Sequence, residues 1–214
     1  MKIAYNYVNI VALGNFNPAI VTPDFLNIDC ELKLGEPTDQ SPSIIPVHRH
    51  IQFKNRIFDV DMDVLKISET GIEDINKATI TDFFSVFYER LPYTPLRAVG
   101  VNINCNLTIT EILIDKLSKP QTYLKFLNAK EIVTTEKSLQ TITDKNWMGS
   151  NYQVNNVHGL TRLIKIDRKK DIIKLNYNYE ASNLEKDKKR LKLLLNEYKR
   201  FCNEFLSFIK FLEE

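Results

Sequence analysis

Apolar and polar residues alternate strictly in three separate stretches, and this alternation most constrains how the chain can fold. The stretches are FDVDMDV at 58–64, VNINCNLTI at 101–109 and IIKLNYNYE at 172–180. Because successive side chains of a β-strand point to opposite faces, each stretch predicts a strand with one apolar and one polar face. Three such strands indicate an antiparallel sheet that is covered on one face and exposed to solvent on the other.

Amphipathic helices are predicted to follow two hairpin patterns. A hairpin pattern at 50–67, turning near Lys54-Asn55, precedes a helix at 79–91 whose aromatic residues form one stripe. A second hairpin pattern, at 160–180, precedes a terminal helix. Ser182 and Glu185 have the spacing of a capping box, so this helix is expected to run from there to about residue 212.

These elements predict one α+β domain over residues 1–214. Its expected architecture is a curved antiparallel sheet with helices packed on one face and a long C-terminal helix. The order of hairpin and helix occurs twice, which indicates two pseudo-repeat halves at 1–110 and 111–214. The similarity between the halves is one of layout, because few of their residues are identical.

The predicted C-terminal helix has a wider apolar stripe than one contact with a sheet requires. Such a helix can pack on the sheet and still leave apolar area for a neighbouring chain. Burial within the chain is the simpler interpretation, and contact with a protein partner or a second copy is the other. On the second interpretation, the predicted partner-binding residues are Phe201, Phe208, Phe211 and Leu193.

Asp59, Asp61 and Asp63 share the polar face of one predicted strand, shortly after the histidines of HRH at 48–50. Neighbouring residues on one strand face lie about 7 Å apart, too far for three carboxylates of one strand to bind a single ion. Two histidines at this spacing also lack a third ligand. The favoured interpretation is a polar strand face with no metal site and no catalytic residues. A metal-dependent hydrolase using Asp59, Asp61 and His48 is kept as an alternative.

Several functional classes lack their usual motifs here. The chain has no GxSxG, GxGxxG or GxxxxGK[ST] motif, which argues against common nucleophile and nucleotide-phosphate sites. Its three cysteines are far apart and predict neither a disulfide framework nor a zinc site, so a reducing cytoplasm is expected. No apolar run is long enough for a membrane-spanning helix. No cofactor is expected.

Basic residues concentrate toward the C-terminal part of the chain, although the net charge is only +2. Residues 1–80 carry 11 acidic and 7 basic groups, whereas residues 160–200 carry 13 basic and 6 acidic groups. Such segregation is typical either of a solvated helix face or of a nucleic-acid-binding surface. The second interpretation predicts contacts from Arg168, Lys169, Lys170, Lys188, Lys189 and Arg190, within the basic segment 162–200.

Two short motifs carry a resemblance. GNFNP at 14–18 and TPLRAVGVN at 94–102 resemble small uncharacterised bacterial and phage α+β proteins with a GNFNP-like turn and a TP-x-x-A-x-G-x-N strand. The layout is also similar to an uncharacterised bacterial α+β family with an R-x-x-G-x-N-like strand, which Arg97, Gly100 and Asn102 match. The resemblance covers about half of the chain. It implies an α+β fold and, by analogy only, an accessory role in a multi-gene system such as antiviral defence.

The sequence thus favours a cytoplasmic, non-enzymatic binding or adaptor protein, with enzymatic activity left open. It is expected to contact a protein partner, or to form a homo-oligomer, through the polar sheet face or the C-terminal helix. Nucleic-acid binding through 162–200 is the first alternative, and the metal-dependent hydrolase is the second.

Overall fold

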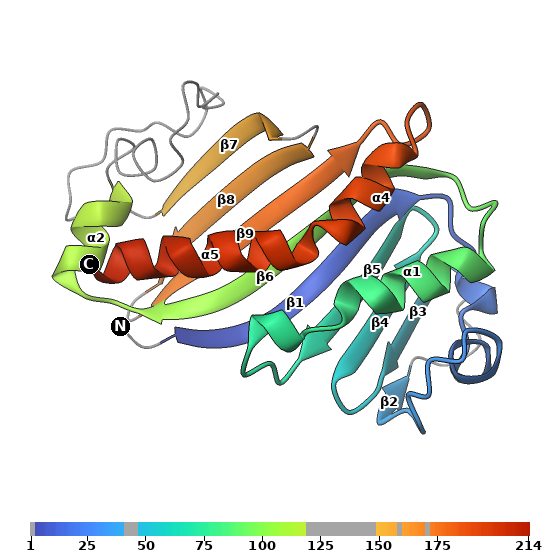
Figure 1. Ribbon diagram of the computed structural model, residues 1–214. Coiled ribbons are helices and arrows are strands. Elements are labelled where there is room, and N and C mark those ends of the chain that lie inside the picture. Colours follow the sequence, from blue (N-terminus) through green and yellow to red (C-terminus); the bar gives the residue numbers. More distant parts are fainter. Residues whose placement is uncertain (1–2, 41–46, 119–148, 158–159, 170–171) are drawn as a thin grey trace.

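Nine strands form one open antiparallel sheet, which confirms the predicted α+β class. The computed structural model describes residues 3–40, 47–118, 149–157, 160–169 and 172–214. The strand order is β2-β3-β4-β5-β1-β6-β9-β8-β7 (Figure 1). The strands are β1 Ile3–Gly14, β2 Asp39–Gln40, β3 His48–Gln52, β4 Arg56–Asp61, β5 Val64–Thr70, β6 Leu96–Thr108, β7 Gly149–Val157, β8 Leu160–Arg168 and β9 Ile172–Ser182.

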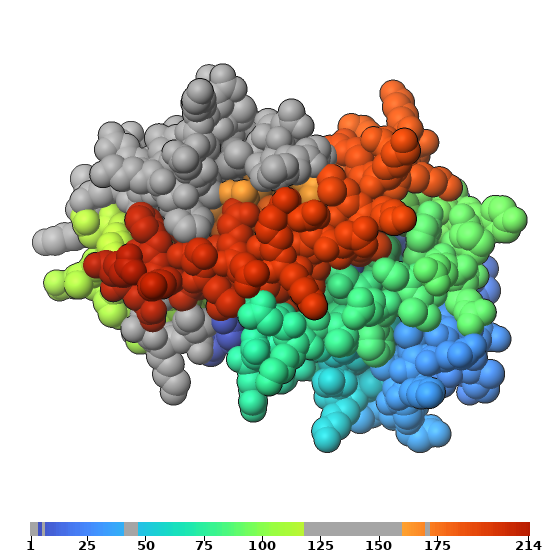
Figure 2. Space-filling model, viewed as in Figure 1, coloured from blue at the N-terminus to red at the C-terminus, as the bar shows by residue number. Residues whose placement is uncertain are grey.

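Three helices lie across one face of the sheet, as the amphipathic patterns predict: α1 (Ile80–Arg90), α4 (Lys189–Asn196) and α5 (Tyr198–Glu213). Figure 2 shows α4 and α5 as one band of atoms across this side of the molecule, bordered by α1 and the loop that follows it. Helix α2 (Glu111–Ser118) lies beside the end of α5. Short helical turns occupy Pro18–Ile20, Phe25–Asp29 and Ile75–Lys77.

The hydrophobic core lies between the helices and the sheet. Alternate residues of the central strands are buried on this side, for example Val8 and Ile10 of β1 with Val101 and Ile103 of β6. Aromatic rings of α5 pack on rings of β9, and the ring of Tyr179 stacks on Phe201 with centroids 3.7 Å apart. The wide apolar stripe of the C-terminal helix is therefore largely used within the chain.

The C-terminal helix differs from the prediction in where it begins and in being divided. Ser182 is the last residue of β9, and Asn183 adopts a left-handed backbone conformation (φ 59°) that turns the chain. Helix α4 begins only at Lys189, so the predicted capping box of Ser182 and Glu185 is wrong. A break at Glu197 then separates α4 from α5.

The first hairpin also contains a turn that the alternation concealed. Strand β4 ends at Asp61, and β5 begins at Val64. Asp63 therefore lies in the turn, where its carboxylate is 3.3 Å from the guanidinium of Arg97. The prediction that three aspartates share one strand face is wrong for Asp63, because FDVDMDV continues its alternation through a chain reversal.

The sheet has an approximate twofold layout about its central pair, β1 and β6. Outward from this pair, one side has β5, β4 and β3, and the other has β9, β8 and β7. Counted from the Asn9–Asn102 pair, Arg56 of β4 corresponds to Arg162 of β8, and both arginines are buried. By this layout the second half begins with β6 at Leu96, earlier than the predicted division at residue 110.

Candidate functional site

The face of the sheet opposite the helices, called the open face here, has a group of asparagines at its centre. Three adjacent strands contribute to this asparagine cluster, which consists of Asn9, Asn102, Asn104, Asn176 and Asn178. Asn102 is paired with Asn9 on one side and with Asn178 on the other, and Asn104 is paired with Asn176. The alternation of β6 and β9 places all of these amides on one side of the sheet.

The hydrogen bonds within the asparagine cluster leave several amide atoms unused. Asn176 Nδ2 donates to Asn102 Oδ1 at 3.2 Å and to Asn104 Oδ1 at 2.8 Å. Within the described part of the chain, Asn9 Oδ1, Asn104 Nδ2 and Asn178 Oδ1 are buried and have no hydrogen-bond partner. The side chain of Asn9 itself is almost fully buried, at 4% exposure. A buried polar atom without a partner costs about 1–3 kcal/mol. These three atoms have almost no accessible surface, so an external partner reaches them only if neighbouring side chains move aside.

Gly100 keeps space open beside the asparagine cluster. A Cβ atom at this position would lie 3.2 Å from Asn178 Oδ1, closer than most Cβ contacts. A larger residue would therefore push the Asn178 amide aside. The residue that matched the resemblance motif thus has a local structural role next to the cluster.

Two histidine–aspartate pairs occupy the β3–β4 side of the open face. His48 Nδ1 is 2.7 Å from Asp61 Oδ1, and His50 Nδ1 is 2.6 Å from Asp59 Oδ1. The antiparallel register places each histidine opposite its aspartate. The residues of the hydrolase alternative therefore divide into two separate pairs.

Within the described residues, these pairs are not part of a larger set of metal ligands. Among the residues that the structure describes, no group of three or more His, Cys, Asp or Glu side chains is placed to hold a metal ion. Asp63, the third aspartate of the motif, interacts instead with Arg97. Each imidazole fixes the orientation of one carboxylate on the polar surface.

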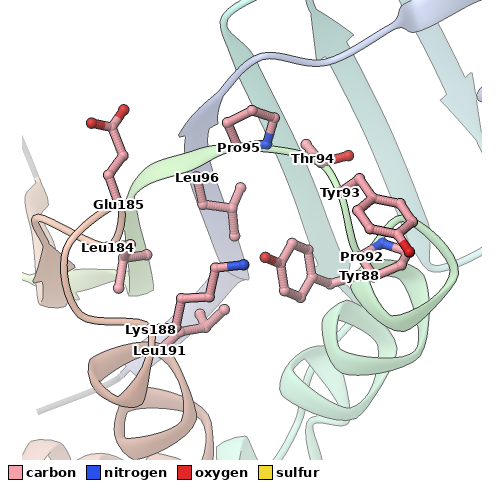
Figure 3. Close-up of a pocket in the computed structure, with 10 residues that line it drawn as sticks. All are labelled: Tyr88, Pro92, Tyr93, Thr94, Pro95, Leu96, Leu184, Glu185, Lys188 and Leu191. Atoms are coloured by element: carbon pink, nitrogen blue, oxygen red, sulfur yellow. The ribbon is translucent and has the colours of Figure 1, made fainter.

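A groove lies on the other side of the sheet, between α1 and α4. One cavity of about 330 Å³ is lined by residues of α1, the following loop and the start of α4, as Figure 3 shows. A second cavity of about 430 Å³ shares Tyr88, Lys188 and Leu191 with it. Together these two cavities are called the α1–α4 groove here. One feature visible in the sequence, the Pro92-Tyr93-Thr94-Pro95 loop, belongs to the groove. The sequence alone does not show that α4 lies beside this loop and completes the cavity.

The four predicted partner-binding residues have two different environments. Phe201 (1% exposed) and Phe208 (0%) lie in the core against β9, so their rings are not accessible in this structure. Leu193 and Phe211 are only partly buried at the edge of the core. Of the four, only these two present surface that a partner could contact.

The predicted nucleic-acid-binding residues do not form one patch. Arg168 and Lys169 precede β9, whereas Lys188, Lys189 and Arg190 follow it, and β9 spans 11 residues or about 37 Å. Arg190 also donates a hydrogen bond to the carbonyl of Ser182. Lys170 lies outside the described residues. The two basic groups therefore lie beyond opposite ends of β9.

No protein-family model matches the chain, and no curated protein matches it. Within the described part of the chain, no helix has the length and apolar character that are needed to cross a membrane.

Proposed function

We propose that this chain is a non-enzymatic binding protein and that a partner protein docks on its open face over the asparagine cluster. The observation that supports this most is the set of buried amide atoms that have no partner among the described residues, Asn9 Oδ1, Asn104 Nδ2 and Asn178 Oδ1. Leaving them unused is unfavourable, and hydrogen bonds from a partner would remove that penalty once side-chain movement on docking exposes them. Because an amide offers both a donor and an acceptor, backbone groups of a partner chain suit the cluster.

The arrangement of charge on the open face also favours a protein partner. The asparagines are neutral and charged residues surround them: the histidine–aspartate pairs on β3 and β4, the Lys165–Asp167 pair on β8, and Lys174 and Glu180 at the two ends of the cluster on β9. Protein interfaces typically have few charges at the centre and a polar rim. A broad sheet face is also better suited to another protein surface than to a small molecule, which requires a concave pocket.

The sequence resemblance supports an accessory role. We infer that the partner is another component of a bacterial or phage multi-protein system, of which antiviral defence is one type. Two other arrangements are compatible with this proposal: a second copy of this chain on the open face, which would give a homo-oligomer, and a protein that contacts Leu193 and Phe211 on the helix side.

The test is binding to purified products of the neighbouring genes, followed by light scattering and titration. We expect at least one stable complex, or self-association. The double variant Asn104→Ala/Asn178→Ala should weaken it about tenfold or more, because it removes central hydrogen-bonding groups. The matched control is Asn203→Ala, which changes an exposed asparagine on the helix side of the molecule.

Melting temperatures distinguish lost binding from lost folding in these variants. The double variant should unfold within a few degrees of the wild type, because its amides are not fully satisfied in the free chain. The proposal fails if the purified chain stays monomeric and binds none of these products. It also fails if the folded double variant binds as tightly as the wild type.

A further inference from the structure

The α1–α4 groove has an apolar floor at the junction of the two halves. Helix α1 packs on β1 and β5 of the first half, and α4 packs on β9 of the second. Leu96, Leu184 and Leu191 line the cavity between them and are themselves nearly buried. The groove therefore offers a preformed apolar surface, in a volume close to the lower limit of the roughly 300–1,000 Å³ typical of small-ligand pockets.

One positive charge, Lys188, points into the first cavity of the groove, whereas Glu89 and Lys192 line the second. Figure 3 shows the ammonium group of Lys188 directed toward the hydroxyl of Tyr88, whereas the carboxylate of Glu185 points away from the cavity. Throughout the described ranges, no carboxylate lies within ion-pair distance of Lys188. A cation beside an apolar floor is complementary to an anion that carries an apolar body.

The rim of the groove supplies an aromatic side chain. Tyr93 lies between Pro92 and Thr94-Pro95, lines the cavity and is 96% exposed. Prolines restrict the backbone on both sides of Tyr93, so the loop keeps this residue at the rim of the cavity. An aromatic residue this exposed gains contact area when it covers a ligand.

We propose that the α1–α4 groove binds a small amphipathic anion, a molecule with an aromatic or aliphatic body and one carboxylate, sulfonate or phosphate group. The apolar body lies on the leucine floor beside Tyr88. The negative group pairs with Lys188, and the Tyr88 hydroxyl donates a hydrogen bond to it. This site is on the opposite side of the sheet from the asparagine cluster and does not depend on the partner proposed there.

The test compares two fluorescent probes that share their rings and differ in charge. 8-Anilinonaphthalene-1-sulfonate carries a sulfonate, and N-phenyl-1-naphthylamine is its neutral counterpart. We expect saturable binding of the anionic probe with one site per chain. Lys188→Gln should weaken that binding about tenfold and leave the neutral probe unaffected, because it removes one charge-assisted contact. Lys189→Gln, a neighbouring exposed lysine that does not line the groove, should change neither affinity.

Hydrogen exchange locates the bound probe independently. Saturation with the sulfonate should slow exchange in 88–96 and 184–192 and leave β3 and β4 unchanged. Equal effects of the Lys188 and Lys189 variants, or equal affinity for the neutral probe, would mean adventitious association and would overturn the proposal. If a partner that binds the open face also displaces the probe, the groove is part of a protein interface, and the small-ligand assignment is wrong.

Discussion

Arg56 and Glu69 form a buried ion pair that also holds the start of α1. Arg56 Nη1 is 3.0 Å from Glu69 Oε1, and their side chains are only 4% and 10% exposed. Arg56 donates a hydrogen bond to the hydroxyl of Thr79, and the Glu69 carboxylate accepts one from the backbone N–H of Thr79. The guanidinium also lies over the ring of Phe83. The hydrogen bonds and the ring contact offset part of the cost of removing both charges from water. Burial still lowers the pKa of the Arg56 guanidinium, whose Nε has no hydrogen-bond partner among the described residues.

Removing one member of this pair should be strongly destabilising. Arg56→Met leaves the Glu69 carboxylate buried without its cation, so we expect the free energy of unfolding in urea to fall by about 3–5 kcal/mol. Arg56→Met/Glu69→Met should lose clearly less than the sum of the single variants. As a control, Arg97→Met removes an exposed pair and should cost less than about 1 kcal/mol. Equal losses of unfolding free energy in the Arg56 and Arg97 variants would contradict the burial of the Arg56–Glu69 pair.

At the equivalent position in the second half, a buried arginine again pairs with a glutamate, but a different element supplies that glutamate. Arg162 of β8 is buried and pairs with Glu204, which comes from α5 and not from the sheet. The hydroxyl of Tyr177 donates to the same carboxylate at 3.1 Å. In both halves, then, a buried arginine on the second strand outward from the central pair connects the sheet to a helical segment.

At the scale of elements, α5 is part of the core. The rings of Phe205 and Phe208 lie 5.7 and 5.9 Å from Tyr177, and the Tyr198 hydroxyl donates to the carbonyl of Ile75 in the first half. Helix α5 therefore joins the two halves as well as covering β9. Contacts within the chain therefore account for most of the apolar residues of α5.

Two phenylalanines of α5 allow a matched test of this role. Phe208→Ala empties a fully buried site and should cost about 3–5 kcal/mol in unfolding free energy. Phe211→Ala makes the same chemical change at a half-buried position and should cost about 1–2 kcal/mol. Denaturant unfolding measures both. If the two losses are similar, or if Phe208→Ala is neutral, α5 does not pack as described.

The strands that alternate were predictable from the sequence, because burial on one face imposes a period of two on residues such as Val101 to Leu107. Chain reversals were harder to predict. Nothing in FDVDMDV marks the turn at Met62-Asp63, and the capping spacing of Ser182 and Glu185 is a local pattern that the strand pairing overrides. The histidine–aspartate pairs and the α1–α4 groove form between elements that are separate in the sequence. Residue spacing within one element does not predict which strands and helices become neighbours.

At the scale of the whole molecule, burial places several weak acids in the core between the sheet and the helices. Burial raises the pKa of the Cys105 thiol to about 12. It also raises the pKa values of the Tyr177, Tyr179 and Tyr198 hydroxyls. All four groups are therefore held in their neutral forms, and all shift in the same direction.

This common direction predicts a loss of stability at alkaline pH. In the unfolded chain these groups ionise near their ordinary pKa values, 9.0 for the thiol and 10.0 for the hydroxyls. Their contribution to stability is complete below about pH 9 and declines above it, because only the unfolded state then releases protons easily. Melting temperatures should be level from pH 7 to about 8.5 and fall steeply between about pH 10 and 12. A level profile up to pH 12 would contradict the buried environment.

The central position of β6 sets an order of events during synthesis on the ribosome. This 13-residue strand emerges long before β9, which ends about 70 residues later. The edge of β6 that pairs with β9 therefore stays unpaired until β9 has been synthesised. At 5–20 residues per second the wait lasts roughly 4–15 s. An unpaired strand edge readily adds a strand from another chain. Neighbouring nascent chains on one messenger RNA are therefore most exposed to strand exchange in this interval, and slower initiation or a bound chaperone would protect the product.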